Sequence, residues 1–94
     1  MLSRISNWIA SRRTRRQFVC EDVQQLLQRD PVNAYYDAQR AAARARLAGE
    51  PIFAFHWAKV AAEIARVSDA EMDFDVVRAI VDEEERRAAQ VDHP

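Results

Sequence analysis

Glycine is almost absent from this chain, and its absence constrains the fold more than any other feature of the sequence. Gly49 is the only glycine among 94 residues, and the three prolines stand at positions 31, 51 and 94. The tight turns of β-sheet proteins depend heavily on glycine, so an all-β fold would lack its usual connections. Alanine, the strongest helix former, makes up roughly a fifth of the residues. The composition therefore predicts an all-α protein.

The length and the balance of residue types predict one small domain. Hydrophobic residues make up 49% of the chain and charged residues 31%, which is typical of a globular protein rather than a disordered one. The runs without a charge, such as residues 5–11 and 51–58, are far shorter than the roughly 20 residues that cross a bilayer. A chain of 94 residues is long enough for a single core.

Apolar periodicity and capping residues predict three principal helices, over residues 31–48, 51–67 and 71–88. Asp30 can accept backbone N–H groups at the start of the first helix, where Pro31 fits without losing a bond. Gly49 stands where a helix commonly ends with a positive φ, and Pro51 can open the next helix. The sequence thus predicts a central helical hairpin, around which a small helical bundle forms.

The helix over residues 51–67 has apolar side chains on two faces. The stronger stripe, which we expect to be the core face, consists of Phe53, Trp57, Val60, Ile64 and Val67. The opposite face, a candidate helix interface, consists of Phe55, Ala58, Ala62 and Ala65. The helix over residues 31–48 also has alanines opposite its larger apolar residues. We therefore expect both helices to pack on two sides, against another helix or a second subunit.

The third helix is predicted from a capping box. Ser68 and Glu71 have the Ser-x-x-Glu spacing in which each side chain bonds the other's backbone N–H group. The acids that follow alternate as in the first half of a calcium loop, but Phe74 occupies the position that requires glycine. Acidic side chains in the first turn of a helix stabilise its N-terminus, and this explains the alternating acids without a bound calcium ion.

The chain divides into a basic amphipathic N-terminal segment (residues 1–20), a helical domain (21–90) and a frayed tail (91–94). The N-terminal segment begins with an apolar face at helical spacing, a possible lipid or partner contact formed by Leu2, Ile5, Trp8 and Ile9. A cluster of cations that could contact an anion or partner follows, formed by Arg12, Arg13, Arg15 and Arg16. The apolar pattern stops there, and a second short helix is expected from Phe18 to Arg29.

The two ends of the chain carry opposite charge. Residues 1–20 contain five arginines and no acid, whereas residues 69–94 contain nine acids and three arginines. We therefore expect the N-terminal arginines to pair with the acids at positions 82–85, within one chain or between two subunits.

Few side chains of this sequence could support catalysis or bind a metal. Cys20 is the only cysteine, and the histidines are His56 and His93, which give neither a zinc-ligand set nor a nucleophile beside a base. A single glycine excludes the usual phosphate-binding loops. We expect His56 to be partly buried and hydrogen-bonded to a neighbour. The sequence predicts no catalytic residue, no metal, no cofactor and no small-molecule substrate, and hence a protein that is not an enzyme.

The compartment is predicted from the cysteine content and the N-terminus. A lone cysteine is typical of the reducing cytoplasm. Residues 1–18 also resemble a mitochondrial presequence, because they are rich in arginine and free of acids, so the mitochondrial matrix is an alternative. A location at the periphery of a membrane is the other alternative.

The function expected from these observations is a small helical protein-interaction module that binds a protein partner or a second copy of itself. One alternative is peripheral binding to an anionic membrane through residues 2–16. Another is accessory binding to nucleic acid through the cluster from Arg12 to Arg16. The pI of about 6.1 and the acidic C-terminal region oppose the nucleic-acid alternative.

Overall fold

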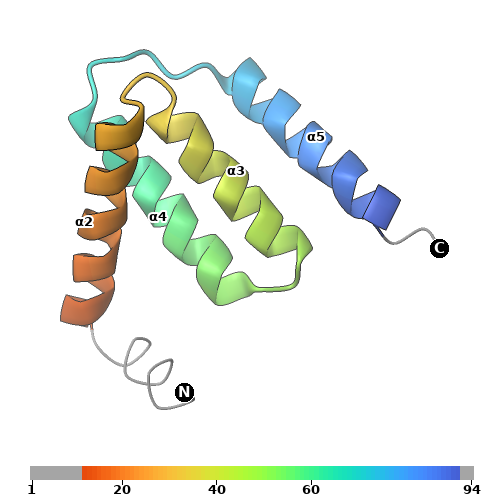
Figure 1. The fold of residues 1–94 in the computed structure, drawn as a ribbon, viewed down its shortest axis with the longest axis horizontal. Coiled ribbons are helices and arrows are strands. Elements are labelled where there is room, and N and C mark those ends of the chain that lie inside the picture. Colours follow the sequence, from red (N-terminus) through yellow and green to blue (C-terminus); the bar gives the residue numbers. More distant parts are fainter. Residues whose placement is uncertain (1–11, 92–94) are drawn as a thin grey trace.

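The computed structural model describes residues 12–91, which form four helices and no strand. The helices are α2 (Arg12–Arg29), α3 (Ala34–Leu47), α4 (Pro51–Val67) and α5 (Phe74–Val91). Helix α3 lies between α4 and α5, and α2 packs against α4 and α3 (Figure 1). The all-α fold with a central hairpin is therefore confirmed. The predicted apolar face of Leu2, Ile5, Trp8 and Ile9, and the tail from residue 92 onward, lie outside the described residues.

The turn between α3 and α4 has the predicted geometry. Gly49 has a φ of 73°, and its N–H group donates to the carbonyl of Arg46 at 3.1 Å. The Glu50 N–H group donates to the carbonyl of Ala45 at 2.9 Å, which completes a Schellman motif. Pro51 then occupies the first turn of α4, which spans the predicted residues 51–67.

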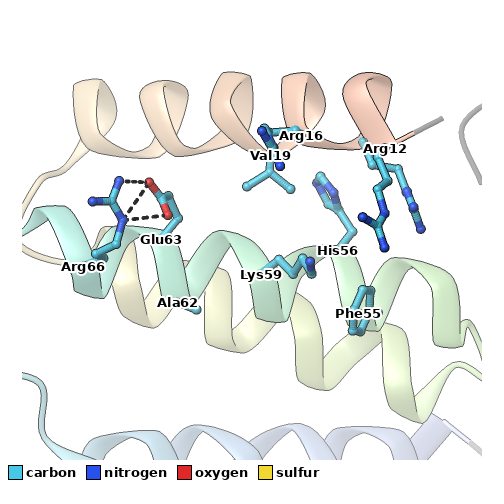
Figure 2. A pocket seen from close by; sticks show the side chains of 10 residues that line it. Arg12, Arg16, Val19, Phe55, His56, Lys59, Ala62, Glu63 and Arg66 are labelled. Atoms are coloured by element: carbon cyan, nitrogen blue, oxygen red, sulfur yellow. Dashed lines mark hydrogen bonds and ion pairs between the residues drawn. The ribbon is translucent and has the colours of Figure 1, made fainter.

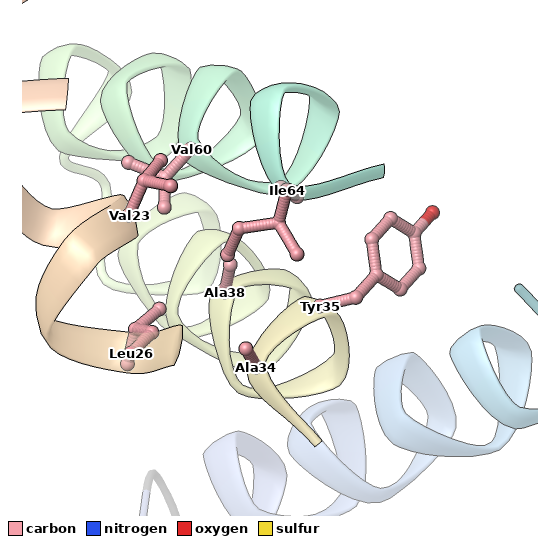
Figure 3. Packing of buried hydrophobic residues seen from close by; sticks show 8 residues of the cluster. Val23, Leu26, Ala34, Tyr35, Ala38, Val60 and Ile64 are labelled. Atoms are coloured by element: carbon pink, nitrogen blue, oxygen red, sulfur yellow. The ribbon is translucent and has the colours of Figure 1, made fainter. Parts of the chain in front are cut away.

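The core lies where α2, α3 and α4 meet (Figure 3). Its buried members are Val23, Leu26, Ala34, Tyr35, Ala38, Val60, Ala61 and Ile64. Small side chains on α3 allow α4 to approach closely, so that Val60 and Ile64 are almost fully buried. Helix α3 also contacts α5 on its other side, so it packs on two sides as predicted.

The core face predicted for α4 is wrong at its two ends. Phe53 and Val67 are about half exposed, and Trp57 is only partly buried. Helix α4 packs against α2 as well as α3, and this second neighbour shifts its buried face toward His56 and Ala61. The alternation of apolar residues could not indicate that shift, because it does not specify where a neighbouring helix lies.

Helix α2 is longer than predicted. It runs without a break from Arg12 to Arg29, so the expected interruption at the arginine cluster is wrong, and the boundary between residues 20 and 21 falls inside the helix. Arginine is a good helix former, and a charged face does not interrupt the backbone hydrogen bonds of a helix. Phe18, where the helix was expected to begin, is 43% exposed, whereas Val23 and Leu26 are buried.

Helix α3 begins at Ala34, three residues later than predicted. The Asp30 carboxylate does accept backbone N–H groups, from Val32 at 3.2 Å and Asn33 at 3.3 Å, but these bonds close a turn that precedes the helix. A hydrogen bond from the Asn33 side chain is the main reason that the pKa of Asp30 is lowered.

Helix α5 begins at Phe74, and the predicted capping box is wrong. Ser68 Oγ accepts the Ala70 N–H group at 3.2 Å, but residues 68–73 are not helical. Asp73 takes the capping role, because its Oδ1 accepts the Asp75 N–H group at 2.8 Å. The start is delayed because α5 packs on α3 rather than on α4, so the chain must first cross the end of α3 (Figure 1).

A buried carboxylate joins α5 to α3. The Glu84 side chain is 3% exposed, and it accepts hydrogen bonds from Arg40 Nη1 at 2.7 Å and from Arg44 Nε at 2.6 Å. Glu83 is 3.4 Å from Arg40 and 2.9 Å from Arg87. Helices α2 and α5 do not contact each other. The expected pairing within one chain between the N-terminal arginines and the acids at 82–85 is therefore wrong, because α3 supplies arginines of its own.

We expect this cluster to make the stability of the protein depend on acidic pH. The bond from Arg44, with that from Arg40, lowers the pKa of Glu84 below its ordinary value of 4.5. A depressed carboxyl pKa stabilises the fold above the ordinary value, and this contribution is lost as the pH falls through the folded-state pKa. Urea unfolding from about pH 7 to about pH 3 should therefore show a smaller loss of stability in Glu84→Gln than in the wild type. Glu85→Gln, in an exposed neighbour, is the matched control and should retain the wild-type loss.

Candidate anion-binding groove

A groove of about 700 Å³ runs between α2 and α4 (Figure 2). Its cationic lining comes from Arg12, Arg15, Arg16, Lys59 and Arg66, and the rest from Val19, Phe55, His56, Ala62 and Glu63. Five of these ten side chains are cationic and one is acidic. We refer to this feature as the α2/α4 groove.

The arginines line the groove because one face of α2 is apolar in its C-terminal half and cationic in its N-terminal half. Val23 and Leu26, in its C-terminal half, are buried in the core, and Val19 at the next turn is partly buried. Continuing this stripe toward the N-terminus at helical spacing leads to Arg16 and Arg12. The face that packs against α4 at one end is therefore cationic at the other. No ion pair or hydrogen bond joins the side chains of these arginines to any other residue in the range 12–91.

Helix α4 supplies a cation and an aromatic ring to the opposite wall. The Lys59 Nζ atom lies 5.2 Å from the centre of the Phe55 ring, within range of a cation–π interaction. Phe55 is 57% exposed. The carboxylate of the groove belongs to Glu63, which is bound by Arg66 on the same helix, and this bond lowers the pKa of Glu63. That carboxylate therefore does little to neutralise Lys59 and the arginines of α2.

A histidine–carboxylate pair joins the two walls. His56 Nε2 and Asp22 Oδ2 are 2.6 Å apart, and the His56 side chain is 7% exposed. The ring of His56 also packs edge-on against Trp57, with the ring centres 5.1 Å apart. The expected hydrogen bond of His56 is confirmed, but the side chain is buried rather than partly buried, because α2 covers it. The bond positions α2 against α4.

We expect Asp22→Ala to lower the free energy of unfolding by about 1–3 kcal/mol, because a buried polar atom of His56 loses its partner on α2. Chemical denaturation monitored by circular dichroism would measure the loss. Glu21→Ala, next to it on α2 and exposed, should change stability by less than about 0.5 kcal/mol. Equal effects of the two substitutions would contradict a structural role for this hydrogen bond.

The groove brings together residues from two separate sequence predictions. Arg12, Arg15 and Arg16 of the predicted cationic cluster face Phe55 and Ala62 of the predicted helix interface. The other members, Arg13 on α2 with Ala58 and Ala65 on α4, are exposed outside the groove.

Two cations of the groove were not predicted. Lys59 and Arg66 share one side of α4 with Phe55 and Ala62, at helical spacing, and this pattern could have indicated them. The meeting of that face with α2 is a feature of the tertiary structure.

No helix within residues 12–91 combines the length and the apolar character needed to cross a bilayer. The same part of the chain has no cluster of three or more histidine, cysteine or acidic side chains placed to bind a metal. No protein-family model, curated protein or solved structure matches the chain.

Proposed function

We propose that the protein is a non-enzymatic helical interaction module that binds an acidic protein segment in the α2/α4 groove. The observation that carries this proposal is the uncompensated charge of the groove. Arg12, Arg15 and Arg16 have no ion-pair partner among the described residues, and Lys59 faces them from α4. Cations held close together repel one another, and bound carboxylates would offset that repulsion.

The chemistry of the cations favours carboxylates as ligands. Guanidinium groups donate two parallel hydrogen bonds to a carboxylate, so neighbouring arginines bind acidic side chains with defined geometry. Phe55 adds an exposed aromatic surface beside the charges. A groove with both features suits a polypeptide that combines acids with an apolar side chain.

The shape and charge of the molecule favour a protein over a nucleic acid or a membrane as the partner. The arginines line a groove between two helices, which suits a single extended chain better than a duplex or a flat lipid surface. The net charge of the whole chain is −1, and its last 26 residues hold nine acids. These acids would repel an extended polyanion, whereas a short acidic segment can bind at a distance from them.

We expect a fluorescein-labelled decaglutamate peptide to bind the full chain, with an affinity that falls as salt is added. Arg12→Gln, Arg15→Gln and Arg16→Gln combined should weaken binding roughly 3- to 150-fold, since each exposed ion pair contributes about 0.2–1 kcal/mol. The matched control removes the same number of arginines outside the groove, as Arg13→Gln, Arg46→Gln and Arg86→Gln. Fluorescence anisotropy measures both.

Equal weakening by the two triple variants would contradict a site in the groove. Phosphatidylserine vesicles or a DNA duplex would replace the acidic protein as the partner under two conditions. They would have to bind more tightly than decaglutamate, and only the variant of Arg12, Arg15 and Arg16 would have to lose that binding. A decalysine peptide, which is cationic like the groove, should bind neither the full chain nor the two triple variants.

A further inference from the structure

We infer that the partner of the α2/α4 groove is a second copy of this chain, whose residues 69–75 bind in it. This inference rests on the proposed function and names the occupant of the groove. We refer to residues 69–75, which follow α4 and enter the first turn of α5, as the acidic segment.

The acidic segment matches the groove in charge and in aromatic content. It contains four carboxylates and no cation, and its acids are Asp69, Glu71, Asp73 and Asp75, all exposed. Phe74 is 76% exposed, more than any other large apolar side chain of the described residues. Docking would place these carboxylates near the arginines and would cover Phe74 and Phe55 together. Aromatic anchors surrounded by charged pairs are typical of specific protein interfaces.

The segment is held in place by its own chain. The Asp73 N–H group donates to Tyr36 Oη at 3.0 Å, and Met72 is partly buried against the core. Asp75 is fixed in the first turn of α5 by the Asp73 carboxylate. A segment that is ordered before binding loses little conformational entropy when it docks.

The acidic segment and the groove of one chain lie on different parts of the molecule. The segment crosses the end of α3 toward α5, whereas the groove lies between α2 and α4 (Figure 1). Among the described residues, no ion pair joins the segment to the groove. Two complementary surfaces on separate parts of one chain make a head-to-tail contact between copies, which extends into a chain or closes into a ring.

The other acids of the C-terminal region suit the groove less well. Glu83 and Glu84 are occupied by Arg40. Asp82 and Glu85 are exposed, but Arg78 and Arg86 lie at helical spacing on the same side of α5 and reduce its negative charge. The acidic segment is therefore the part of the chain that fits the groove best.

Removal of charge from the two surfaces tests the inference. The full chain should form oligomers in size-exclusion chromatography with light scattering at about 0.1 M salt, and should become monomeric at about 1 M, where the Debye length falls from about 10 Å to about 3 Å. A groove variant (Arg12→Gln, Arg15→Gln, Arg16→Gln) and a segment variant (Asp69→Asn, Glu71→Gln, Asp75→Asn) should each be monomeric. Circular dichroism would establish that both remain folded.

The mixture of the two variants gives the sharpest result. The groove variant retains a native segment and the segment variant retains a native groove, so an equimolar mixture should form a one-to-one dimer and nothing larger. A mixture that stays monomeric overturns the inference. A wild type that stays monomeric up to about 1 mM protein also overturns it, because a contact with a millimolar dissociation constant would be half formed at that concentration. If that monomer still binds decaglutamate, the proposed function stands with another protein as partner. If it does not, both fail.

Discussion

Ile64→Ala is expected to lower the free energy of unfolding by about 2–5 kcal/mol, because it removes buried methylene and methyl groups and leaves a cavity. Ile64 is 1% exposed and lies where α2, α3 and α4 meet. Its neighbour across the interface is Ala38, whose side chain is too small to fill the space (Figure 3). Urea denaturation monitored by circular dichroism would measure the loss as a lower midpoint with an unchanged slope.

Val67→Ala is the matched control on the same helix. Val67 belongs to the apolar stripe that the sequence predicts for the core, but it is 47% exposed. We expect its replacement to cost less than about 1 kcal/mol, since little area is lost from a half-exposed side chain. If Val67→Ala proved as destabilising as Ile64→Ala, the buried face of α4 would be the one predicted from periodicity.

Arg40→Met combined with Arg44→Met is expected to destabilise the protein by about 3–5 kcal/mol at neutral pH. These two side chains bind Glu84, whose side chain is 3% exposed. Their removal would leave a buried carboxylate without its partners, and such a charge is costly in a poorly solvated site. Thermal and urea unfolding would both report the loss, which should shrink at acidic pH, where Glu84 can bind a proton.

The triple variant Arg40→Met, Arg44→Met and Glu84→Leu separates burial of a charge from loss of packing. An apolar replacement of the whole cluster removes the desolvated charge, and substitutions of this kind range from neutral to stabilising by about 1–4 kcal/mol. We therefore expect the triple variant to recover most of the stability that the double variant loses. A triple variant as unstable as the double variant would mean that the arginine stems, rather than the charges, hold α5 on α3.

Self-association through the groove would also increase the buried apolar area of a protein whose core is small. The largest fully buried side chains among the described residues are Ile64 and Val60, which is a modest core. Phe55 and Phe74 are mostly exposed in the single chain. Burial of these rings between copies would add apolar area to a domain that lacks it, and would make its stability depend on protein concentration.

The local features of the fold could be predicted where neighbouring residues along the chain determine them. The hairpin turn followed from Gly49 and Pro51, because positive φ and a fixed φ are properties of single residues. The start of α5 could not be predicted in the same way. Ser68 and Asp73 both have capping side chains, and the choice between them depends on the path across the end of α3.

The candidate site was predictable only in parts. The arginine cluster and the apolar side of α4 that includes Phe55 were visible in the sequence as separate features. Their meeting in one groove, with Lys59 between them, depends on how α2 lies across α4. The hydrogen bond between His56 and Asp22, 34 positions apart, likewise could not be read from either residue alone.

The sequence by itself determined that the protein is helical, that α3 and α4 form a hairpin, and that positive and negative charge are concentrated at opposite ends of the chain. Backbone propensity, single-residue conformation and net charge are properties of short segments, so they do not depend on how the helices pack together. The tertiary structure decided which face of α4 is buried, which arginines bind Glu84, and which cations line the groove. Each of these depends on the side of a helix that meets a neighbour, and residues distant in the sequence determine that meeting.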